Sequence, residues 1–274
     1  MGGNEADISA VGRVLLLGCG RMGGAMLAGW LAGGLRPGQV QVIEPHPSDW
    51  LGARAAEGLA LNPGALEQPD VAVLAVKPQM MAEAAPGLAA FGGGGTLMLS
   101  VAAGTPIARF EAMFGPGTPI IRAMPNTPAA IGRGISAYTG NAAATETHHA
   151  TADILLRAVG KAVRLEGEHQ MDAVTGLSGS GPAYVFHLIE AMAAAGEAQG
   201  LAPDLAMTLA RETVCGAGAL AGQDPAPAAV LRENVTSPGG TTAAGLAVLM
   251  EELPDLMRRT VAAAADRGRE LARD

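Results

Sequence analysis

The sequence predicts two domains in series: an α/β domain built on a doubly wound parallel sheet, then an all-α domain. Short apolar runs alternate with helical segments up to about residue 165. No such run follows residue 167, where the segments are long, rich in alanine and apolar at helical spacing. A glycine-rich turn also joins the first apolar run to the first helix. The expected domains are therefore residues 1–166 and 167–274.

The composition excludes several classes of protein. With 274 residues, 49% hydrophobic and 16% charged, the chain can bury a sizeable core. Its net charge is −8 without a basic run, which argues against a nucleic-acid partner. No apolar run is long enough for a membrane span, and the polar, acidic opening, residues 1–7, is unlike a signal peptide. Cys19 and Cys215 lack ligand spacing, so we expect no metal site, no disulfide framework and a cytoplasmic location.

The first elements carry a nucleotide-binding fingerprint. Residues 13–17 are typical of a buried strand, and they lead through Gly18, Gly20 and Gly23 into a helix of small residues. Glycines at this spacing allow a tight turn, the approach of a pyrophosphate and close packing of helix on strand. The next strand ends in Glu44, about 20 residues past the last glycine, as the fingerprint requires. This context predicts a Rossmann-like domain that binds a dinucleotide.

The alternation continues along the chain. After the strand at 39–44, strands are expected at 59–61, 70–76, 96–101, 119–124, 134–139 and 161–165, with helices at 47–57, 80–90, 107–114 and 144–158. Parallel strands bring their carboxyl ends to one edge of the sheet, which is where ligands bind in this fold. The loops at 77–78, 102–103 and 124–126 fall at that edge.

The second domain is expected to be helical throughout. Helices are predicted at 171–177, 182–199, 203–220, 228–231 and 243–253, and Pro254 is expected to begin a final helix. Helices lined by alanine and glycine pack closely, but a small lone bundle of them has little bulk for a core. We therefore expect a homodimer, or a dimer-based oligomer, with interleaved helices.

The segment N-V-T-S-P-G-G-T-T, residues 234–242, connects two of these helices. Ser237 or Thr236 is expected to cap the second helix, with Pro238 in its first turn. Gly239–Gly240 would let a ligand approach the backbone, and the start of a helix favours a carboxylate. A well-capped helix start without a ligand is the plain alternative.

Five segments together resemble pyrroline-5-carboxylate reductase, the last enzyme of proline synthesis. They follow the family's order between about residues 13 and 253: GCGRMG at 18–23, AVKPQ at 75–79, MPNTP at 124–128, GLSGSGPAY at 176–184 and NVTSPGGTT at 234–242. The last two are the specific ones, because many reductases share the glycine fingerprint. The resemblance implies reduction of 1-pyrroline-5-carboxylate to L-proline by hydride from NADPH or NADH.

The resemblance also implies the site residues. Substrate would be bound by Ser237, Gly239, Gly240, Thr241 and Thr242. Thr242 would be catalytic, near the ring nitrogen; whether it donates the proton or only orients the ring is open, since water is another source. The coenzyme would contact the glycine turn, the edge loops and three asparagines, namely Leu17, Gly18, Cys19, Gly20, Arg21, Met22, Gly23, Glu44, Asn62, Ala75, Val76, Lys77, Pro78, Val101, Ala102, Ala103, Asn126 and Asn234.

The segment that begins at Glu44 departs from the family pattern. Many members carry an uncharged residue there, followed by arginine or serine, which suits a 2′-phosphate. Glu44 would instead accept hydrogen bonds from a free 2′-hydroxyl, which slightly favours NADH. His46 and Ser48 would still bind a phosphate if Glu44 pointed away, so NADPH stays open.

Two other functions compete with this reading. A related imine or hydroxyacid reductase would share the two-domain plan, but the second domain lacks the lysine of the hydroxyacid group, because no lysine follows Lys161. A non-catalytic nucleotide-sensing protein would need only the glycine turn, and not the segment at 234–242. His148 and His149 lie on a polar helical segment and are expected to be exposed.

Overall fold

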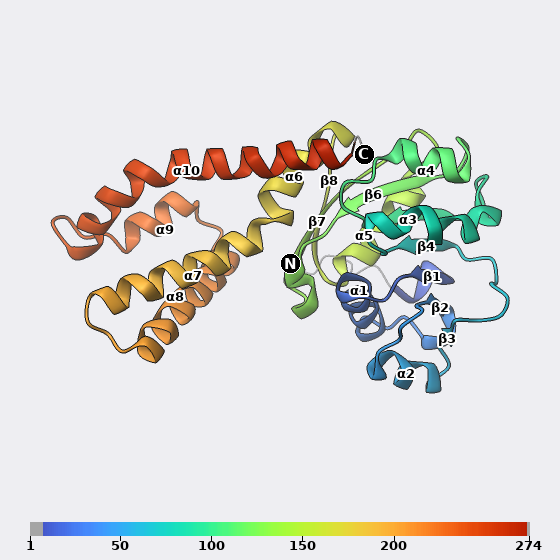
Figure 1. The fold of residues 1–274 in the computed structure, drawn as a ribbon, viewed down its shortest axis with the longest axis horizontal. Coiled ribbons are helices and arrows are strands. Elements are labelled where there is room, and N and C mark those ends of the chain that lie inside the picture. Colours follow the sequence, from blue (N-terminus) through green and yellow to red (C-terminus); the bar gives the residue numbers. More distant parts are fainter. Residues whose placement is uncertain (1–7, 273–274) are drawn as a thin grey trace. The chain divides into compact units, whose positions relative to one another are not determined.

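The computed structural model describes residues 8–272, so the acidic opening segment lies outside the described residues. The chain forms two compact units, one of Met1–Gly179 with Ala264–Asp274, the other of Ser180–Ala263. The first unit holds a sheet with covering helices, and the described part of the second is helical (Figure 1). The sequence predicts a functional boundary after residue 166, between a coenzyme-binding and a substrate-binding domain, and this boundary stays a prediction.

The sheet has eight strands in the order β3-β2-β1-β4-β5-β6-β7-β8, and every predicted strand takes part in it. Their bounds are β1 Val14–Leu17, β2 Val40–Ile43, β3 Ala60–Leu61, β4 Val71–Leu74, β5 Leu97–Ser100, β6 Ile120–Met124, β7 Gly134–Gly140 and β8 Gly160–Arg164. The doubly wound parallel arrangement is confirmed from β3 to β6.

One edge of the sheet departs from the prediction of a purely parallel sheet. Strand β7 runs antiparallel to β6, and β8 runs parallel to β7. Residues 125–133 separate β6 from β7, and they include the short 3₁₀ helix η4, Thr127–Ile131, and a left-handed Gly132 with φ +67°. A parallel connection needs a crossover of about a dozen residues or more, so this link reverses the chain direction instead.

Helices cover both faces of the sheet. α1, Arg21–Ala32, and α5, Glu146–Arg157, pack on the face that carries Leu16, and the Trp30 indole Nε1 donates to the Leu155 carbonyl at 2.9 Å. α3, Pro78–Ala84, and α4, Ile107–Phe114, pack on the opposite face. Because both faces are covered there, the inner strands β1 and β4 consist of continuous apolar runs, whereas the edge strand β8 is largely exposed.

The other elements of this unit are short. They are α2 Asp49–Ala56, α6 Met171–Val174 with a π-helical turn at Thr175–Gly179, and the 3₁₀ helices η1 Ile8–Val11, η2 Pro37–Gln39, η3 Ala85–Phe91 and η5 Glu168–Gln170. The helix predicted at 80–90 is divided into α3 and η3. Pro86 explains the break, because it has no N–H to donate within an α-helix.

The second unit contains α7 Gly181–Ala198, α8 Pro203–Gln223, α9 Ala228–Asn234 and the first part of α10, Thr241–Leu271. A left-handed Gly200 turns the chain between α7 and α8. These two helices pack through small side chains: Ala193 and Ala206 are buried, and a Cβ built on Gly196 would lie 3.3 Å from the Cβ of Ala206. This close packing agrees with the alanine and glycine content of the sequence.

The prediction of two helices separated at Pro254 is wrong, because α10 is one helix, Thr241–Leu271. Proline inside a helix costs about 3 kcal/mol, which the helix-favouring residues on both sides offset. The boundary between the compact units falls within this helix, after Ala263. Its last turns belong to the first unit, where Ala265 and Gly268 are buried. None of the helices between residues 8 and 272 is both long and apolar enough to cross a membrane.

Candidate active site

The glycine turn after β1 gives each glycine a different task. Gly18 has φ +89°, and a Cβ on it would lie 2.7 Å from Cγ1 of Val76. A Cβ on Gly20 would meet no heavy atom of the described chain within 4 Å, whereas one on Gly23 would lie 2.1 Å from the Gly18 carbonyl oxygen. The first glycine thus makes the turn, the second leaves open space at the start of α1, and the third lets helix and strand touch. These are the properties that a pyrophosphate cradle requires.

The residues between these glycines present mainly their backbone. Cys19 is half-buried, and its N–H donates to Oε2 of Glu44 at 2.8 Å. Burial, and then the Glu44 charge, raise the pKa of the Cys19 thiol to about 11, so the thiol is neutral. Met22 packs against the core, while Arg21 is exposed at the first position of α1. Leu17, the last residue of β1, is buried.

Glu44 and Asn62 meet beyond the ends of β2 and β3. The Glu44 N–H donates to Oδ1 of Asn62 at 2.9 Å, and Nδ2 of Asn62 donates to the Glu44 carbonyl at 2.9 Å. Among the described residues, Asn62 is the one non-glycine residue with positive φ, at +46°. The structure therefore brings Glu44 into contact with both Asn62 and the glycine turn.

The loops after β4 and β5 lie at the same sheet edge as the glycine turn. The Ala75 N–H donates to the Leu17 carbonyl at 2.8 Å, and the Val101 N–H donates to the Leu74 carbonyl at 3.0 Å. Two series of predicted contact residues, Ala75–Val76–Lys77–Pro78 and Val101–Ala102–Ala103, follow these bonds directly. Lys77 is exposed just before α3, whereas Val101 and Ala102 are buried and leave their backbone as the contacting part.

Asn126 makes contacts that the sequence did not suggest. Its side chain is buried, with Oδ1 accepting from the Ile135 N–H at 3.0 Å and Nδ2 donating to the Ser178 carbonyl at 3.1 Å. It therefore joins the start of β7 to the π-helical turn Thr175–Gly179. The coenzyme contact expected of this residue stays a prediction.

The segment at 234–242 forms a turn rather than the capped helix start that we expected. The Gly240 N–H donates to the Ser237 carbonyl at 3.1 Å, with Pro238 second in the turn and Gly239 at φ +69°. This is the geometry of a type II turn, which takes proline and then glycine at its centre. The expectation that Pro238 lies in the first helical turn is therefore wrong, because α10 begins only at Thr241.

The ends of this turn are set by the helices around it. Thr236 does not cap α10; its Oγ1 donates back to the Arg232 carbonyl at 2.6 Å, at the end of α9. Asn234 is the last residue of α9 and is exposed. Thr241 and Thr242 are exposed at the start of α10, where the N–H groups of a helix have no partner within it. The turn thus places free donors at one helix end.

An ion pair with a buried arginine and a partly exposed glutamate connects β6 of the sheet to η5. Nη1 of Arg122, in β6, lies 2.7 Å from Oε1 of Glu168, and the Arg122 side chain is only 5% exposed. The same carboxylate oxygen accepts from the Ile107 N–H at 2.8 Å, at the start of α4. No local sequence signal identifies this contact, because its partners are far apart along the chain.

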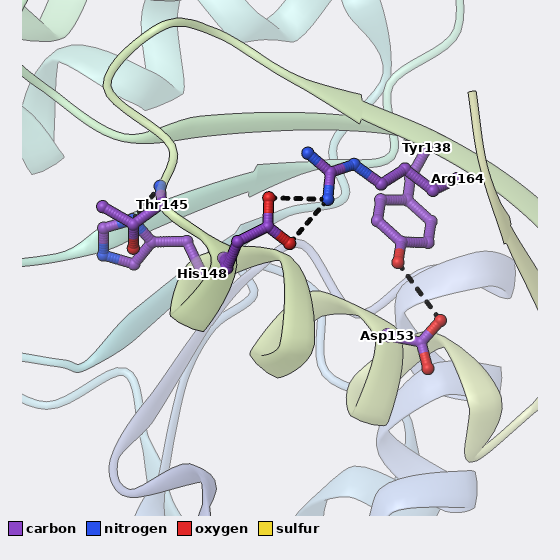
Figure 2. A network of polar contacts seen from close by, with 6 residues as sticks. Tyr138, Thr145, His148, Asp153 and Arg164 are labelled. Carbon is purple, nitrogen blue, oxygen red and sulfur yellow. Dashed lines mark hydrogen bonds and ion pairs between the residues drawn. The ribbon is translucent and has the colours of Figure 1, made fainter. Parts of the chain in front are cut away.

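A polar network lies between α5, β7 and β8 (Figure 2). In it, the Tyr138 hydroxyl donates to Asp153, and Arg164 donates to both oxygens of Glu146. The expectation that both histidines of α5 are exposed is wrong for His149, which packs against the Tyr138 ring at 6.1 Å between centroids. Burial first, and then the Arg164 charge, lower the pKa of His149. No described group hydrogen-bonds its Nδ1.

Comparison with known proteins assigns the two parts of the chain. Residues 168–271 match the family model described as pyrroline-5-carboxylate reductase dimerisation, and residues 13–104 match that of NADP oxidoreductase, coenzyme F420-dependent. Pyrroline-5-carboxylate reductase of Pseudomonas aeruginosa is 38% identical over 264 residues, which cover 95% of this chain and 97% of the relative.

Solved structures agree with this assignment. A pyrroline-5-carboxylate reductase from Coxiella burnetii is 32% identical with a TM-score of 0.88, covering 96% of this chain and 99% of the other. Pyrroline carboxylate reductase from Plasmodium falciparum, with NADP bound, is 26% identical with a TM-score of 0.79, covering 95% and 98%. The chain therefore belongs to the pyrroline-5-carboxylate reductase family.

Proposed function

We propose that this chain reduces 1-pyrroline-5-carboxylate to L-proline with NADPH or NADH, the last step of proline biosynthesis. One observation supports the proposal above all: this member of the family has both the glycine turn and the turn at 234–242. The first offers an open cradle at Gly20, and the second offers free helix donors at Thr241 and Thr242. A nucleotide sensor would need only the cradle, so the second turn favours an enzyme.

In the proposed division of labour, residues 1–166 bind the coenzyme and residues 167–274 bind the substrate and the second subunit. The bound coenzyme supplies a hydride to the imine carbon. The backbone of residues 18–23 cradles the pyrophosphate, and the loops after β4 and β5 flank it. Coenzyme contacts by Asn62, Asn126 and Asn234, and by the side chains of Arg21 and Lys77, remain part of the proposal.

At the substrate turn, the chain's task is to hold a carboxylate and orient a ring. The Gly240 N–H already donates to the Ser237 carbonyl, so we assign the carboxylate chiefly to the N–H groups of Thr241 and Thr242. Gly239 lets the ring approach the backbone, and the Thr242 hydroxyl orients the ring nitrogen. An ordinary alcohol is a poor acid, so water is the alternative proton source. Alignment of the imine carbon and exclusion of water then provide most of the catalysis.

The decisive experiment follows oxidation of NADH and of NADPH by the purified protein with 1-pyrroline-5-carboxylate. Turnover with either coenzyme is expected. Thr242→Ala should lower kcat/KM roughly 10- to 100-fold, and Thr242→Ser, which keeps the hydroxyl, should restore much of it. Coenzyme affinity should stay the same in both variants. Coenzyme binding without turnover in the wild-type protein would contradict the proposal and lead to tests of other cyclic imines.

We also propose that the chain works as a homodimer or a dimer-based oligomer. The second unit leaves many large apolar side chains exposed, among them Val185, Phe186, Leu188, Leu205, Leu209, Leu220, Val248, Leu249 and Met250. Exposed apolar surface on this scale indicates a protein interface. Light scattering at micromolar concentration should give at least twice the mass of one chain, and the mass of a single chain would contradict the proposal.

The cytoplasmic location remains a proposal that rests on the two free cysteines.

A further inference from the structure

The Glu44 carboxylate is fixed beside the glycine turn by two backbone donors. Its Oε2 accepts from the Cys19 N–H at 2.8 Å, and its Oε1 accepts from the His46 N–H at 3.0 Å. Each carboxylate oxygen has two acceptor positions, so both oxygens can still accept another hydrogen bond. The group is partly buried. Glu44 is therefore a preoriented acceptor that faces the turn and does not point away from it.

The backbone of Glu44 is held as firmly as its side chain. The side-chain amide of Asn62 hydrogen-bonds both the backbone N–H and the backbone carbonyl of Glu44. The backbone N–H of Asn62 in turn donates to the Val42 carbonyl at 2.8 Å. Asn62 achieves this in a left-handed conformation, which asparagine tolerates better than most residues. Its amide thus acts as a clamp that extends the pairing of β2 and β3 by one step. This makes Asn62 a positioning residue for Glu44.

The segment that follows β2 offers little to a 2′-phosphate. Between Glu44 and Ala56 the only basic side chains are His46 and Arg54. Arg54 pairs with Glu57 at 2.8 Å, and Oγ of Ser48 accepts from the Leu51 N–H as the cap of α2. The segment also carries a second acid, Asp49. A doubly charged phosphate placed here would meet a fixed carboxylate, and the one arginine of this segment is already paired with Glu57.

We propose that Glu44 accepts hydrogen bonds from the adenine-ribose 2′-hydroxyl and makes this enzyme prefer NADH, with Asn62 as the residue that positions it. An acid at the end of the second strand is the group that binds a free 2′-hydroxyl in this fold. The preference also uses repulsion, because like charges brought together discriminate against the wrong partner. The proposal rests on the proposed function only in taking the glycine turn as the coenzyme site. It sets this chain apart from the relative whose solved structure holds NADP.

The test measures the Kd of NADH and of NADPH by titration calorimetry without substrate, beside kcat/KM for each coenzyme with 1-pyrroline-5-carboxylate. Wild-type protein should bind NADH at least about tenfold more tightly than NADPH, the order of discrimination that one unfavourable charge contact supplies. Glu44→Gln keeps the shape and removes the charge, so it should shrink this ratio, mainly by tightening NADPH.

Asn62→Gly tests the clamp, because glycine keeps the left-handed backbone and lacks the amide. It should weaken NADH binding and raise its KM about three- to tenfold, with kcat at saturating NADH unchanged. Asp49→Asn is the matched control: it removes a nearby charge outside the contact and should leave the ratio of the two dissociation constants within about twofold.

Three results would overturn the proposal: tighter binding of NADPH by the wild-type protein, an equal shift of the ratio by Asp49→Asn and Glu44→Gln, or an unchanged ratio in Glu44→Gln. Loss of kcat in Asn62→Gly with unaltered coenzyme binding would contradict the positioning role. Preference for NADH in binding without any turnover would contradict the proposed reaction and support the role of Glu44.

Discussion

At the scale of single residues, four neighbouring glycines differ in what a side chain would meet. A Cβ would collide with the backbone at Gly23, meet open space at Gly20, and make an ordinary contact at Gly24, 3.5 Å from the Cys19 carbonyl oxygen. Gly18 combines a left-handed φ with a close neighbour. The same substitution, glycine to alanine, therefore probes different properties along a few residues of chain.

We predict that this series separates coenzyme binding from folding. Gly20→Ala should keep its stability within about 0.5 kcal/mol of wild type but weaken binding of both coenzymes, because the methyl group occupies the space over the turn. Gly23→Ala should destabilise the fold by about 2 kcal/mol or more through overpacking. Gly24→Ala is the control and should bind coenzyme normally. Urea denaturation and coenzyme titration of the three variants would show whether the effects separate; normal coenzyme binding by Gly20→Ala would contradict the assignment.

Cys19 provides a second prediction at this scale. Because burial and Glu44 raise its pKa to about 11, alkylation of a Cys215→Ser variant should accelerate about tenfold for each pH unit and level off only near that value. The measurement is the rate of iodoacetamide modification against pH. A plateau near the ordinary value of 9.0 would contradict the proposed environment of the thiol.

The sequence predicted those residue roles that a motif dictates and missed those that depend on distant partners. The tasks of Gly18, Gly20 and Gly23 and the position of Glu44 follow from spacing along the chain. The burial of His149 does not follow from spacing. Its neighbours along α5 are polar and suggest an exposed position, whereas its ring packs against Tyr138. Asn126 follows β6 as the sequence predicted, but its bond to the Ser178 carbonyl is a tertiary contact that no local pattern indicates.

At the scale of elements, the Arg122–Glu168 pair joins β6, the start of α4 and η5 through one carboxylate. We predict that Glu168→Ala destabilises the protein by about 2–4 kcal/mol, because it leaves the buried Arg122 guanidinium without its carboxylate partner and the Ile107 N–H without an acceptor. Glu166→Ala is the matched control: it removes an exposed acid two positions earlier and should cost less than about 0.5 kcal/mol. Urea denaturation at one protein concentration measures both, and equal stability of the two variants would contradict the role of the pair.

Element types were predicted better than their connections. Strands such as β1 and β4 were located from short apolar runs, since burial on both faces leaves little other choice of residues; β8 was also located, although it is largely exposed. The reversal between β6 and β7 was missed because strand direction depends on the length of the link and not on strand composition. The prediction that a new helix begins at Pro254 failed for the opposite reason. Proline disfavours a helix locally, but the helical residues on both sides of it in α10 outweigh this effect. The segment at 234–242 was found, but the cap of the following helix was expected at Thr236 or Ser237, several residues before α10 begins at Thr241.

At the scale of the whole molecule, the polar network around α5 makes stability depend on pH. His149 has a pKa below its ordinary value of 6.5, so the unfolded chain takes up a proton that the folded protein does not. Its contribution is therefore fully present above the unfolded value of 6.5 and is lost as the pH falls from there through the lower pKa of the folded protein. Glu146 acts in the same direction at lower pH, because the hydrogen bond from Arg164 lowers its pKa below 4.5.

We predict that the free energy of unfolding falls between about pH 7.5 and pH 5, and that His149→Phe, which keeps an aromatic ring against Tyr138, removes much of this fall. His187→Gln is the control, since His187 is exposed on α7, and it should retain the wild-type dependence. Urea denaturation at both pH values and one protein concentration is the measurement. An equal fall in the wild-type and His149→Phe proteins would assign the effect to other groups.

The path of α10 has a consequence for how the protein is made. The first compact unit includes residues from both ends of the chain, and its last part, beyond Ala263, includes the buried Ala265 and Gly268. A Cβ on Gly268 would lie 3.3 Å from the Asp172 carboxylate, and the Cβ of Leu271 lies 3.4 Å from the Cβ position of Gly104. During synthesis on the ribosome, these neighbours of α10 remain uncovered until residues 264–272 have been made. The sheet unit is therefore completed only after the whole helical unit, Ser180–Ala263, has been synthesised.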